Sequence, residues 1–127
     1  MKLQRTMMQV YLTDCDAAIE FYKSAFGASI DAVHRNQEDG TIMHAEMTAF
    51  GQCISFSERK FDGVPANTMQ FCFHFGGEES DKDAVRKAYE VLKDGARIDF
   101  PLSSCEWSSL AFGLVDKFGV NWCIFTE

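Results

Sequence analysis

Residues 13–28, TDCDAAIEFYKSAFGA, contain the pattern that decides the fold, and residues 80–96, SDKDAVRKAYEVLKDGA, repeat it. Each segment begins with Thr or Ser followed by Asp, continues with apolar residues at helical spacing, and ends with a Gly-Ala pair. Small polar residues are typical helix N-caps, and glycine suits the left-handed position that closes a helix. The two segments therefore predict two helices, one in each half of the chain.

Strand patterns surround both predicted helices in the same order. One strand precedes each helix, at Met7 to Leu12 and at Gln70 to Phe75. Three further strands follow each helix, at 29–35, 41–50 and 52–57 in the first half and at 97–102, 107–115 and 120–125 in the second. Pro101 is expected to end the strand at 97–102 and to lead into a loop. The stretch that begins at Gly51, GQCISF, also returns at Gly119 as GVNWCI.

The repeated order of strand, helix and three strands predicts an α+β fold. Two βαβββ modules are expected, each with its helix covering one face of a cupped, mostly antiparallel sheet. The first module spans residues 1–58, the second spans residues 68–127, and residues 59–67 form a linker that contains Gly63 and Pro65. The whole chain, residues 1–127, is then a single domain, large enough to bury a hydrophobic core without disulfide support.

The composition argues against several classes of partner. With 19 acidic and 12 basic residues, the net charge is −7, whereas nucleic acids and anionic membrane surfaces attract a basic face. No apolar run approaches the roughly 20 residues that span a bilayer, and the start of the sequence lacks the apolar region of a signal peptide. The five cysteines have no paired spacing and are expected to be reduced thiols. We therefore expect a cytoplasmic protein that binds neither nucleic acid nor a membrane.

Three segments carry a resemblance to a known family: AIEFYKSAFG at 18–27, MHAEM at 43–47 and FGLVDKFGVNW at 112–122. Together they resemble the vicinal oxygen chelate superfamily (glyoxalase I, bleomycin resistance proteins and extradiol dioxygenases), and within it the PhnB-like, or demethylubiquinone methyltransferase-like, branch. The resemblance covers nearly the whole chain and implies a glyoxalase-like fold, a cup lined by the sheets, and a homodimer. The methyltransferase label has little support, because no glycine-rich cofactor turn follows a strand in a parallel α/β unit.

The resemblance also indicates where metal-dependent relatives hold their ion, with one His/Glu pair in each module. In this sequence the corresponding positions are Met7, Ser55, Gln70 and Cys123. A thioether, a hydroxyl, an amide and a single thiol do not form a catalytic site for Mn, Fe, Ni or Zn, which needs neutral imidazoles or ionised carboxylates. We therefore expect no metal and no other cofactor, with a soft ion as the remaining alternative.

Histidines and a glutamate are the candidates for chemistry in the cup. His44 and Glu46 are two residues apart on a predicted strand, so both side chains project from one face. If that face is the cup, Glu46 accepts a hydrogen bond from the imidazole and the pair acts as general acid and base; the alternative is a purely structural pair. A less favoured hypothesis is a zinc site built from His44, Glu46, Cys72 and His74. His34 is expected to be solvated.

The other cup residues follow from alternation along the strands and from the positions that the resemblance indicates. In Gln70 to Phe75 the phenylalanines are expected to face the helix, and the residues between them the cup. Trp107 follows the polar segment 103–106 and is expected either to cover the cup or to lie at a subunit interface, whereas Trp122 should be core. The predicted ligand pocket comprises Met7, Gln9, Ser55, Gln70, Cys72, His74, Trp107 and Cys123.

Three functions are compatible with these features. The first, which we favour, is a metal-free binding protein of the bleomycin-resistance kind that takes a small organic molecule in an apolar, aromatic-rimmed cup. The second is a lyase- or isomerase-type enzyme, metal-independent or with an atypical metal, that uses His44 and Glu46 as acid and base. The third is a scaffold whose outer surface is used and whose cup is filled by side chains. Fold analogy alone does not choose among them, so enzymatic turnover stays an open question.

Overall fold

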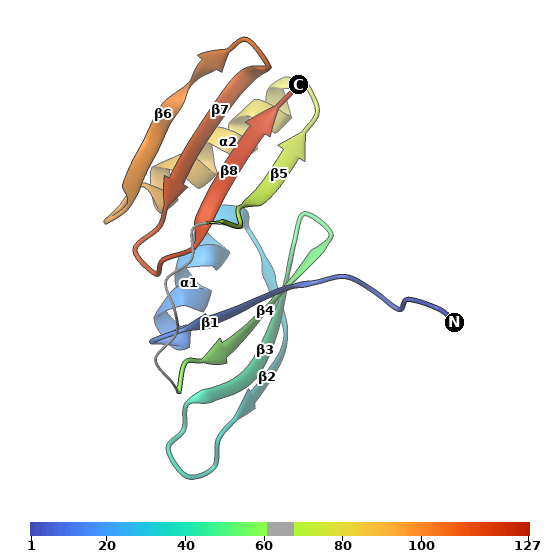
Figure 1. Cartoon of the computed structure of the whole chain (residues 1–127), viewed down its shortest axis with the longest axis vertical. Coiled ribbons are helices and arrows are strands. Elements are labelled where there is room, and N and C mark those ends of the chain that lie inside the picture. The colour runs from blue at the N-terminus through green and yellow to red at the C-terminus, as the bar shows by residue number, and fades with distance from the viewer. Residues whose placement is uncertain (61–67) are drawn as a thin grey trace. The chain divides into compact units, whose positions relative to one another are not determined.

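The computed structural model describes residues 1–60 and 68–127. Its elements follow one another as β1 (Met8–Leu12), α1 (Cys15–Phe26), β2 (Ser29–Arg35), β3 (Ile42–Ala49), β4 (Gln52–Glu58), β5 (Phe71–Phe75), α2 (Glu79–Leu92), β6 (Arg97–Cys105), β7 (Ser108–Val115) and β8 (Asn121–Thr126) (Figure 1). Contacts divide the chain into two compact units, one built on β1 to β4 with α1 and the other on β5 to β8 with α2; Ser24–Phe26, at the end of α1, group with the second unit. The predicted linker lies outside the described residues from 61 to 67.

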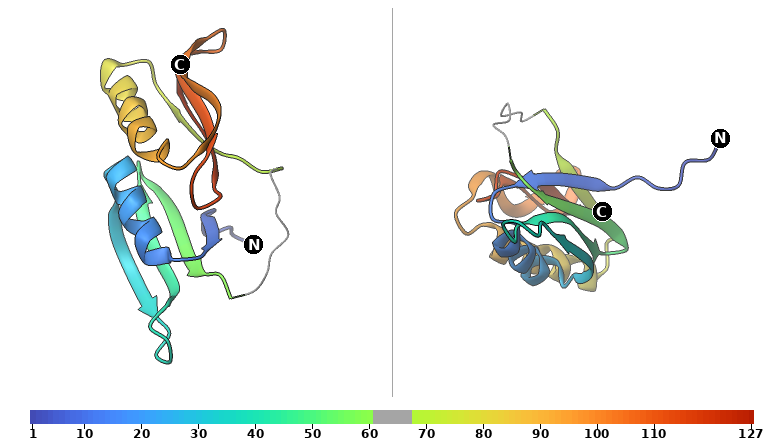
Figure 2. Two further views of the ribbon diagram at one scale, coloured as in Figure 1. Left: turned by 90° about the vertical axis from the view of Figure 1, so that its left-hand side faces the viewer. Right: turned by 90° about the horizontal axis from the view of Figure 1, so that it is seen from below.

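Each unit contains a four-stranded mixed sheet with one helix against one face (Figure 2). The strand order is β1-β4-β3-β2 in the first sheet and β5-β8-β7-β6 in the second. In both sheets the strand before the helix pairs in parallel with the last strand of the unit, and the other pairs are antiparallel. The predicted α+β architecture of two βαβββ modules is therefore confirmed.

Apolar residues from each helix and from one face of its sheet form the core of each unit. In the first unit Tyr22 of α1 stacks on Phe56 of β4 with ring centroids 5.8 Å apart, and both side chains are almost fully buried. In the second unit Tyr89 of α2 meets Phe112 of β7 edge-on at 5.1 Å. We call the other face of each sheet, which points away from its helix, the helix-distal face.

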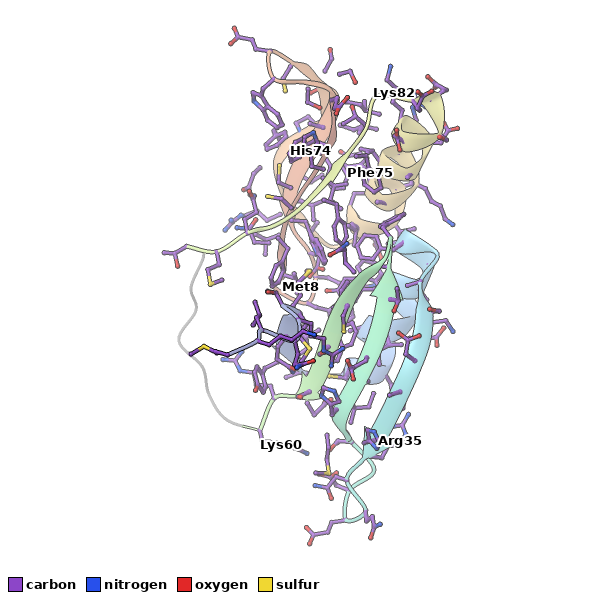
Figure 3. All side chains as sticks on the ribbon, turned by 90° about the vertical axis from the view of Figure 1, so that its right-hand side faces the viewer. Met8, Arg35, Lys60, His74, Phe75 and Lys82 are labelled. Atoms are coloured by element: carbon purple, nitrogen blue, oxygen red, sulfur yellow. The ribbon has the colours of Figure 1, made fainter. Side chains whose placement is uncertain are left out.

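Alternation along β5 sorts its side chains between the two faces of the second sheet. Phe73 is buried beside Trp122 of β8, with ring centroids 5.6 Å apart, whereas Cys72 and His74 are exposed. In Figure 3, His74 and Phe75 lie on opposite sides of β5, with Phe75 on the side of α2. The predicted core position of Trp122 is confirmed by its exposure of only 1%.

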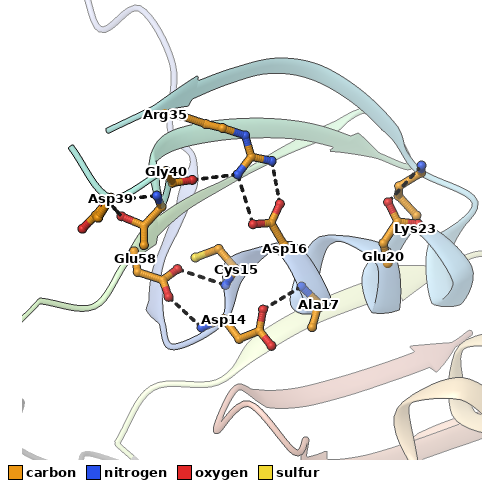
Figure 4. A network of polar contacts seen from close by, with 11 residues as sticks. Asp14, Cys15, Asp16, Ala17, Glu20, Lys23, Arg35, Asp39, Gly40 and Glu58 are labelled. Atoms are coloured by element: carbon orange, nitrogen blue, oxygen red, sulfur yellow. Dashed lines mark hydrogen bonds and ion pairs between the residues drawn. The ribbon is translucent and has the colours of Figure 1, made fainter. Parts of the chain in front are cut away.

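Helix α1 begins and ends where its sequence predicts, and Figure 4 shows the contacts at its start. Asp14 adopts a left-handed backbone with φ 59°, which aspartate tolerates, and its side chain accepts a hydrogen bond from the backbone N–H of Ala17. Glu58, the last residue of β4, accepts hydrogen bonds from the N–H groups of Asp14 and Cys15 at 2.8 and 3.1 Å. Glu58 thereby ties the end of the first sheet to the start of α1. At the other end Gly27, with φ 61°, closes the helix.

Helix α2 begins earlier than the sequence predicts. The Ser80-Asp81 pair predicts the cap, whereas the N-cap residue is Glu78 and the helix spans Glu79–Leu92. Oδ2 of Asp81 accepts a hydrogen bond from the backbone N–H of Glu78 at 3.0 Å, so Asp81 is the third helical residue of a capping box. Its negative charge also lies at the positive end of the helix dipole. No helix in the described part of the chain is long and apolar enough to cross a membrane.

Strand β6 is longer than predicted. It continues through Pro101 to Cys105, where the sequence predicts a loop after residue 102. Pro101 is tolerated because β6 is an edge strand of its sheet and its register with β7 shifts around this proline. The chain therefore turns at Glu106 and Trp107, and Trp107 lies at the tip of the β6–β7 hairpin.

Candidate functional site

The first sheet brings predicted site residues together on its helix-distal face. Gln9 of β1 pairs with Ser55 of β4, and Ser55 pairs with Glu46 of β3, so the three residues lie side by side across adjacent strands. Ser55 is fully buried, and its Oγ donates a hydrogen bond to Sδ of Met7 at 3.4 Å. Ser55 and Met7 are two of the four positions that the resemblance assigns to metal ligands, and here they contact each other through a hydroxyl and a thioether.

Glu46 is the centre of a polar network on this face. Arg5 forms an ion pair with its carboxylate at 2.7 Å, the thiol of Cys53 donates to it at 3.2 Å, and Nε2 of His44 lies 3.4 Å from it. These contacts, in the order Cys53, Arg5 and His44, lower the pKa of Glu46 below its ordinary value. The carboxylate of Glu46 is therefore ionised at neutral pH and paired with the Arg5 guanidinium. Its lowered pKa makes it a weak base.

The His44–Glu46 contact thus forms, with two partners that the sequence analysis missed. Arg5 precedes the first strand, and no pattern in the sequence connects it to Glu46. Cys53 lies two residues before a predicted pocket position on β4, so alternation was a signal for it. Burial and then the bond to Glu46 raise the pKa of Cys53, which makes its thiol a neutral donor. His34 is exposed, as predicted, and its ring lies 6.5 Å from that of His44.

The second sheet carries the other two ligand positions, Gln70 and Cys123. The amide of Gln70 donates to Oδ1 of Asn121 at 3.2 Å, and its Oε1 lies 3.9 Å from the thiol of Cys72. Cys72 and Cys123 are register partners on the parallel strands β5 and β8. Burial, followed by the neighbouring Cys72 thiol, raises the pKa of Cys123 to about 11, so Cys123 is a neutral thiol.

These donor sets do not fit the metal ion of metal-dependent relatives. A hydroxyl against a thioether on one sheet, and an amide near a neutral thiol on the other, supply neither an imidazole nor an ionised carboxylate. Over residues 1–60 and 68–127, no group of three or more His, Cys, Asp or Glu side chains is arranged to hold a metal ion. The less favoured zinc hypothesis, which takes His44 and Glu46 from the first sheet and Cys72 and His74 from the second, stays a prediction.

Four rings form a continuous layer across the helix-distal face of the second sheet. His74 of β5 stacks on Phe125 of β8 at 4.6 Å with 19° between the ring planes, and Trp107 meets Phe125 edge-on at 5.2 Å. Phe100 of β6 meets Trp107 edge-on at 6.2 Å. We call His74, Phe100, Trp107 and Phe125 the aromatic layer.

A glycine beneath the rings makes room for this layer. Phe100 pairs with Gly113 of β7 and its ring covers the glycine, because a Cβ atom at Gly113 would collide with that ring. Trp107 keeps 57% of its surface exposed, whereas Phe100 and Phe125 are half-buried. His74 and Trp107 were predicted from the sequence, whereas Phe100 and Phe125 were not. Phe125 had a signal, since it lies two residues after Cys123 on the same strand and so on the same face.

Comparisons with known proteins identify a family model and a fold. A model of the Glyoxalase/Bleomycin resistance protein/Dioxygenase superfamily matches residues 2–124. Among solved structures, a putative 3-demethylubiquinone-9 3-methyltransferase, a PhnB protein from Bacillus cereus, has 24% identity over 98% of this chain and 100% of that chain, with a TM-score of 0.77. A protein from Pseudomonas aeruginosa has 18% identity over 97% of this chain and 98% of that chain, with a TM-score of 0.77.

A third solved structure is a mutant of the fosfomycin resistance protein FosX from Listeria monocytogenes, in complex with Mn(II) and dihydroxypropylphosphonic acid. It has 13% identity over 98% of this chain and 93% of that chain, with a TM-score of 0.70. No curated protein matches. At these identities the solved structures support the fold alone, and their ligands and activities are their own. The resemblance carried by residues 18–27, 43–47 and 112–122 is confirmed at the level of the superfamily, with a PhnB protein among the structural neighbours.

Proposed function

Because this chain belongs to the glyoxalase/bleomycin resistance protein/dioxygenase superfamily, we propose that it binds a small organic molecule without a bound divalent metal ion. The proposed ligand site is the helix-distal face of the second sheet, with Gln70, Cys72, His74, Trp107 and Cys123 among its contacts. Met7, Gln9 and Ser55 on the first sheet remain predicted ligand contacts.

The aromatic layer is the observation that carries this proposal. Its rings pack on one another edge-on or stacked, so the layer is a preformed surface that pays little side-chain entropy on binding. Trp107 is more than half exposed at 57%, which leaves a large apolar surface available to a ligand. Such exposed aromatic surface on the face away from the core is typical of a binding site rather than of a packed interior.

The chemistry of this face favours a flat, largely apolar ligand with few polar groups. Aromatic pairs contribute about 0.5–1.5 kcal/mol beyond the area that they bury. The amide of Gln70, next to Cys72, is a polar group at the edge of the same strand, and its oxygen can accept one hydrogen bond from a ligand. This face therefore suits a neutral ligand better than an anion.

Titration with flat aromatic probes tests the proposal. N-phenyl-1-naphthylamine and naphthalene are suitable neutral probes, with fluorescence of the bound probe and calorimetry as readouts. Trp107→Ala should weaken binding by about 2 kcal/mol, or roughly thirtyfold in Kd, since it removes the exposed ring of the layer. Ile98→Ala is the matched control: Ile98 of β6 is another exposed apolar residue, at 42%, but it pairs with Leu114 on the helix side of the sheet.

The two variants separate a specific site from general stickiness. Ile98→Ala should leave the Kd of each probe within about twofold of wild type. Equal losses in both variants, or the absence of saturable binding of any flat probe, would contradict the proposal. Thermal unfolding of both variants without probe establishes that any loss is not a loss of fold.

An enzyme that uses His44 and Glu46 is the second candidate, favoured by the 3.4 Å contact between Nε2 of His44 and Oε2 of Glu46. The lowered pKa of Glu46 makes that carboxylate a poor proton acceptor, so His44 would carry the proton transfer and Glu46 would orient it. Turnover of a bound compound by the wild type that His44→Gln abolishes, with binding retained, would favour this candidate over binding alone.

We also propose that the chain is a cytoplasmic homodimer with no nucleic-acid or membrane partner. The family resemblance supports the dimer, and the edge strands of each four-stranded sheet are available for pairing or covering. The net charge of −7 opposes binding to nucleic acid and to anionic lipid. Light scattering of the purified protein measures the oligomeric state directly.

A further inference from the structure

Two thiols face each other on the helix-distal face of the second sheet. Cys72 of β5 and Cys123 of β8 are register partners in a parallel pair, so their side chains project from the same face. Neighbouring strands lie about 4.8 Å apart, within the roughly 4.4–6.8 Å of Cα separation that disulfides span. The Cys72 thiol is also one of the neighbours that raise the pKa of Cys123. Cys72 is exposed and Cys123 is nearly buried, so reagents in solution reach Cys72 first.

We infer that Cys72 and Cys123 form a reversible intramolecular disulfide when the protein meets a low-molecular-weight disulfide such as oxidised glutathione. This modification site goes beyond the proposed function and does not depend on ligand binding. The bond is expected to be easily reduced, because the strand spacing exceeds the Cβ separation of about 3.8 Å that disulfides prefer. Strained and accessible disulfides are the labile ones.

The chemistry is a pair of thiol–disulfide exchanges. The thiolate of Cys72 attacks one sulfur of oxidised glutathione, forms a mixed disulfide and releases one glutathione thiolate. Cys123 then loses its proton to solvent, and its thiolate attacks the Cys72 sulfur, which closes the protein disulfide and expels the second glutathione. Two protein thiols are oxidised and one glutathione disulfide is reduced to two thiols, so atoms and electrons balance.

The other three cysteines lack this arrangement. Cys15 is fully buried. Cys53 pairs in register with Thr48, so no thiol faces it on the neighbouring strand β3. Cys105 is exposed at the end of β6 and pairs with Ser108. Cys105 is therefore the matched competitor, an accessible thiol of the same sheet whose register partner is not a cysteine.

Peptide mapping of the wild-type protein tests the inference directly. Trypsin places each cysteine in a separate peptide, with Cys72 in residues 61–82, Cys105 in residues 98–117 and Cys123 in residues 118–127. Native protein is incubated with oxidised glutathione, remaining thiols are alkylated, and the digest is analysed without reduction. We expect the intact protein to lose the mass of two hydrogen atoms and the first and third of these peptides to be linked. Reduced glutathione should restore both free thiols.

Serine variants identify the order of the steps. Cys123→Ser should stop at a mixed disulfide on Cys72, Cys72→Ser should abolish the linked peptides, and Cys105→Ser should form the link as the wild type does. A link that includes Cys105, a glutathione adduct on wild-type Cys72 that never closes, or a link that forms only in denaturant would overturn the inference. The main readout uses the wild-type protein, so a variant that fails to fold does not decide the outcome.

Discussion

A single buried carboxylate, Asp116, sets the direction of the strand that carries much of the candidate site. It is 4% exposed and accepts hydrogen bonds from the backbone N–H groups of Phe118 and Val120 and from Nε1 of Trp122, all at 2.9–3.0 Å. These bonds shape the turn before β8 and fix the indole on the helix side of the sheet. Because side chains alternate along a strand, Cys123 is then directed to the helix-distal face.

The raised pKa of Cys123, about 11 and caused mainly by burial, predicts that closure of the proposed disulfide accelerates with pH. Only a thiolate attacks a disulfide, so the closure rate should rise about tenfold per pH unit between roughly pH 7 and 9, well below this pKa. The titratable groups that influence the pKa of Cys123 are the thiols of Cys72 and Cys105. Gly113, the register partner of Cys123 on β7, has no titratable side chain. His74 lies farther along the same face of β5.

The mixed disulfide on Cys72, isolated from Cys105→Ser protein at low pH, provides the measurement. It is transferred to buffers of increasing pH, quenched with acid and mapped for closure. Because Cys72 is then blocked, the pH dependence belongs to the attacking thiol. A rate that stays flat from pH 7 to 9 would contradict a buried, protonated Cys123.

At the scale of elements, the approach of β6 to β7 depends on the missing side chain of Gly113. A Cβ atom there would collide with the ring of Phe100, so Gly113→Ala must displace that ring or the edge strand that carries it. Overpacking of this kind costs about 1–3 kcal/mol. We expect Gly113→Ala to lower the free energy of unfolding by that amount in urea titrations, and to reduce the affinity of flat probes for the aromatic layer.

Gly77→Ala is the matched control, because a Cβ atom at Gly77 would have only one neighbour within 4 Å, the Cβ of Glu127 at 3.9 Å. That substitution should change stability by less than about 0.5 kcal/mol. In Gly113→Ala/Phe100→Leu the smaller side chain should recover part of the lost stability. Equal effects of the two glycine substitutions would mean that the close contact with Phe100 does not determine the packing of β6.

Elements with local signals were predictable, and those decided by their neighbours were not. The Asp14 cap and Gly27 fixed the bounds of α1, because both act within one helical turn. For α2 the sequence predicted a cap at Ser80-Asp81, whereas the N-cap residue is Glu78 and Asp81 is the third helical residue of its capping box. Pro101 predicted a break in β6, a prediction that was wrong because a proline on an edge strand with shifted register removes no required hydrogen bond.

At the scale of the whole molecule, the repeat was the strongest signal, since two copies of one pattern predicted both modules and both sheets. Residues of the candidate site that alternate along one strand, such as Cys72 and His74, could be assigned to a face. Contacts that join distant segments of the chain could not be predicted from the sequence. Arg5 reaches Glu46 across 41 positions of sequence, and Phe100 meets Trp107 only because β6 continues past its proline. Side-chain reach and hairpin length are tertiary properties that no local pattern encodes.

The whole-molecule prediction concerns metal ions. The family resemblance assigns the metal-ligand positions to Met7, Ser55, Gln70 and Cys123, which offer a thioether, a hydroxyl, an amide and a neutral thiol. Addition of Mn, Ni or Zn ions to chelator-treated, tag-free protein should therefore shift its Tm by less than about 1 °C. An ion held at a hundred times its Kd would add about 2.7 kcal/mol of stability and shift the Tm by several degrees. Such a shift with one ion, together with stoichiometric metal by elemental analysis, would contradict the metal-free site, because these four donors should bind Mn, Ni or Zn too weakly to produce it.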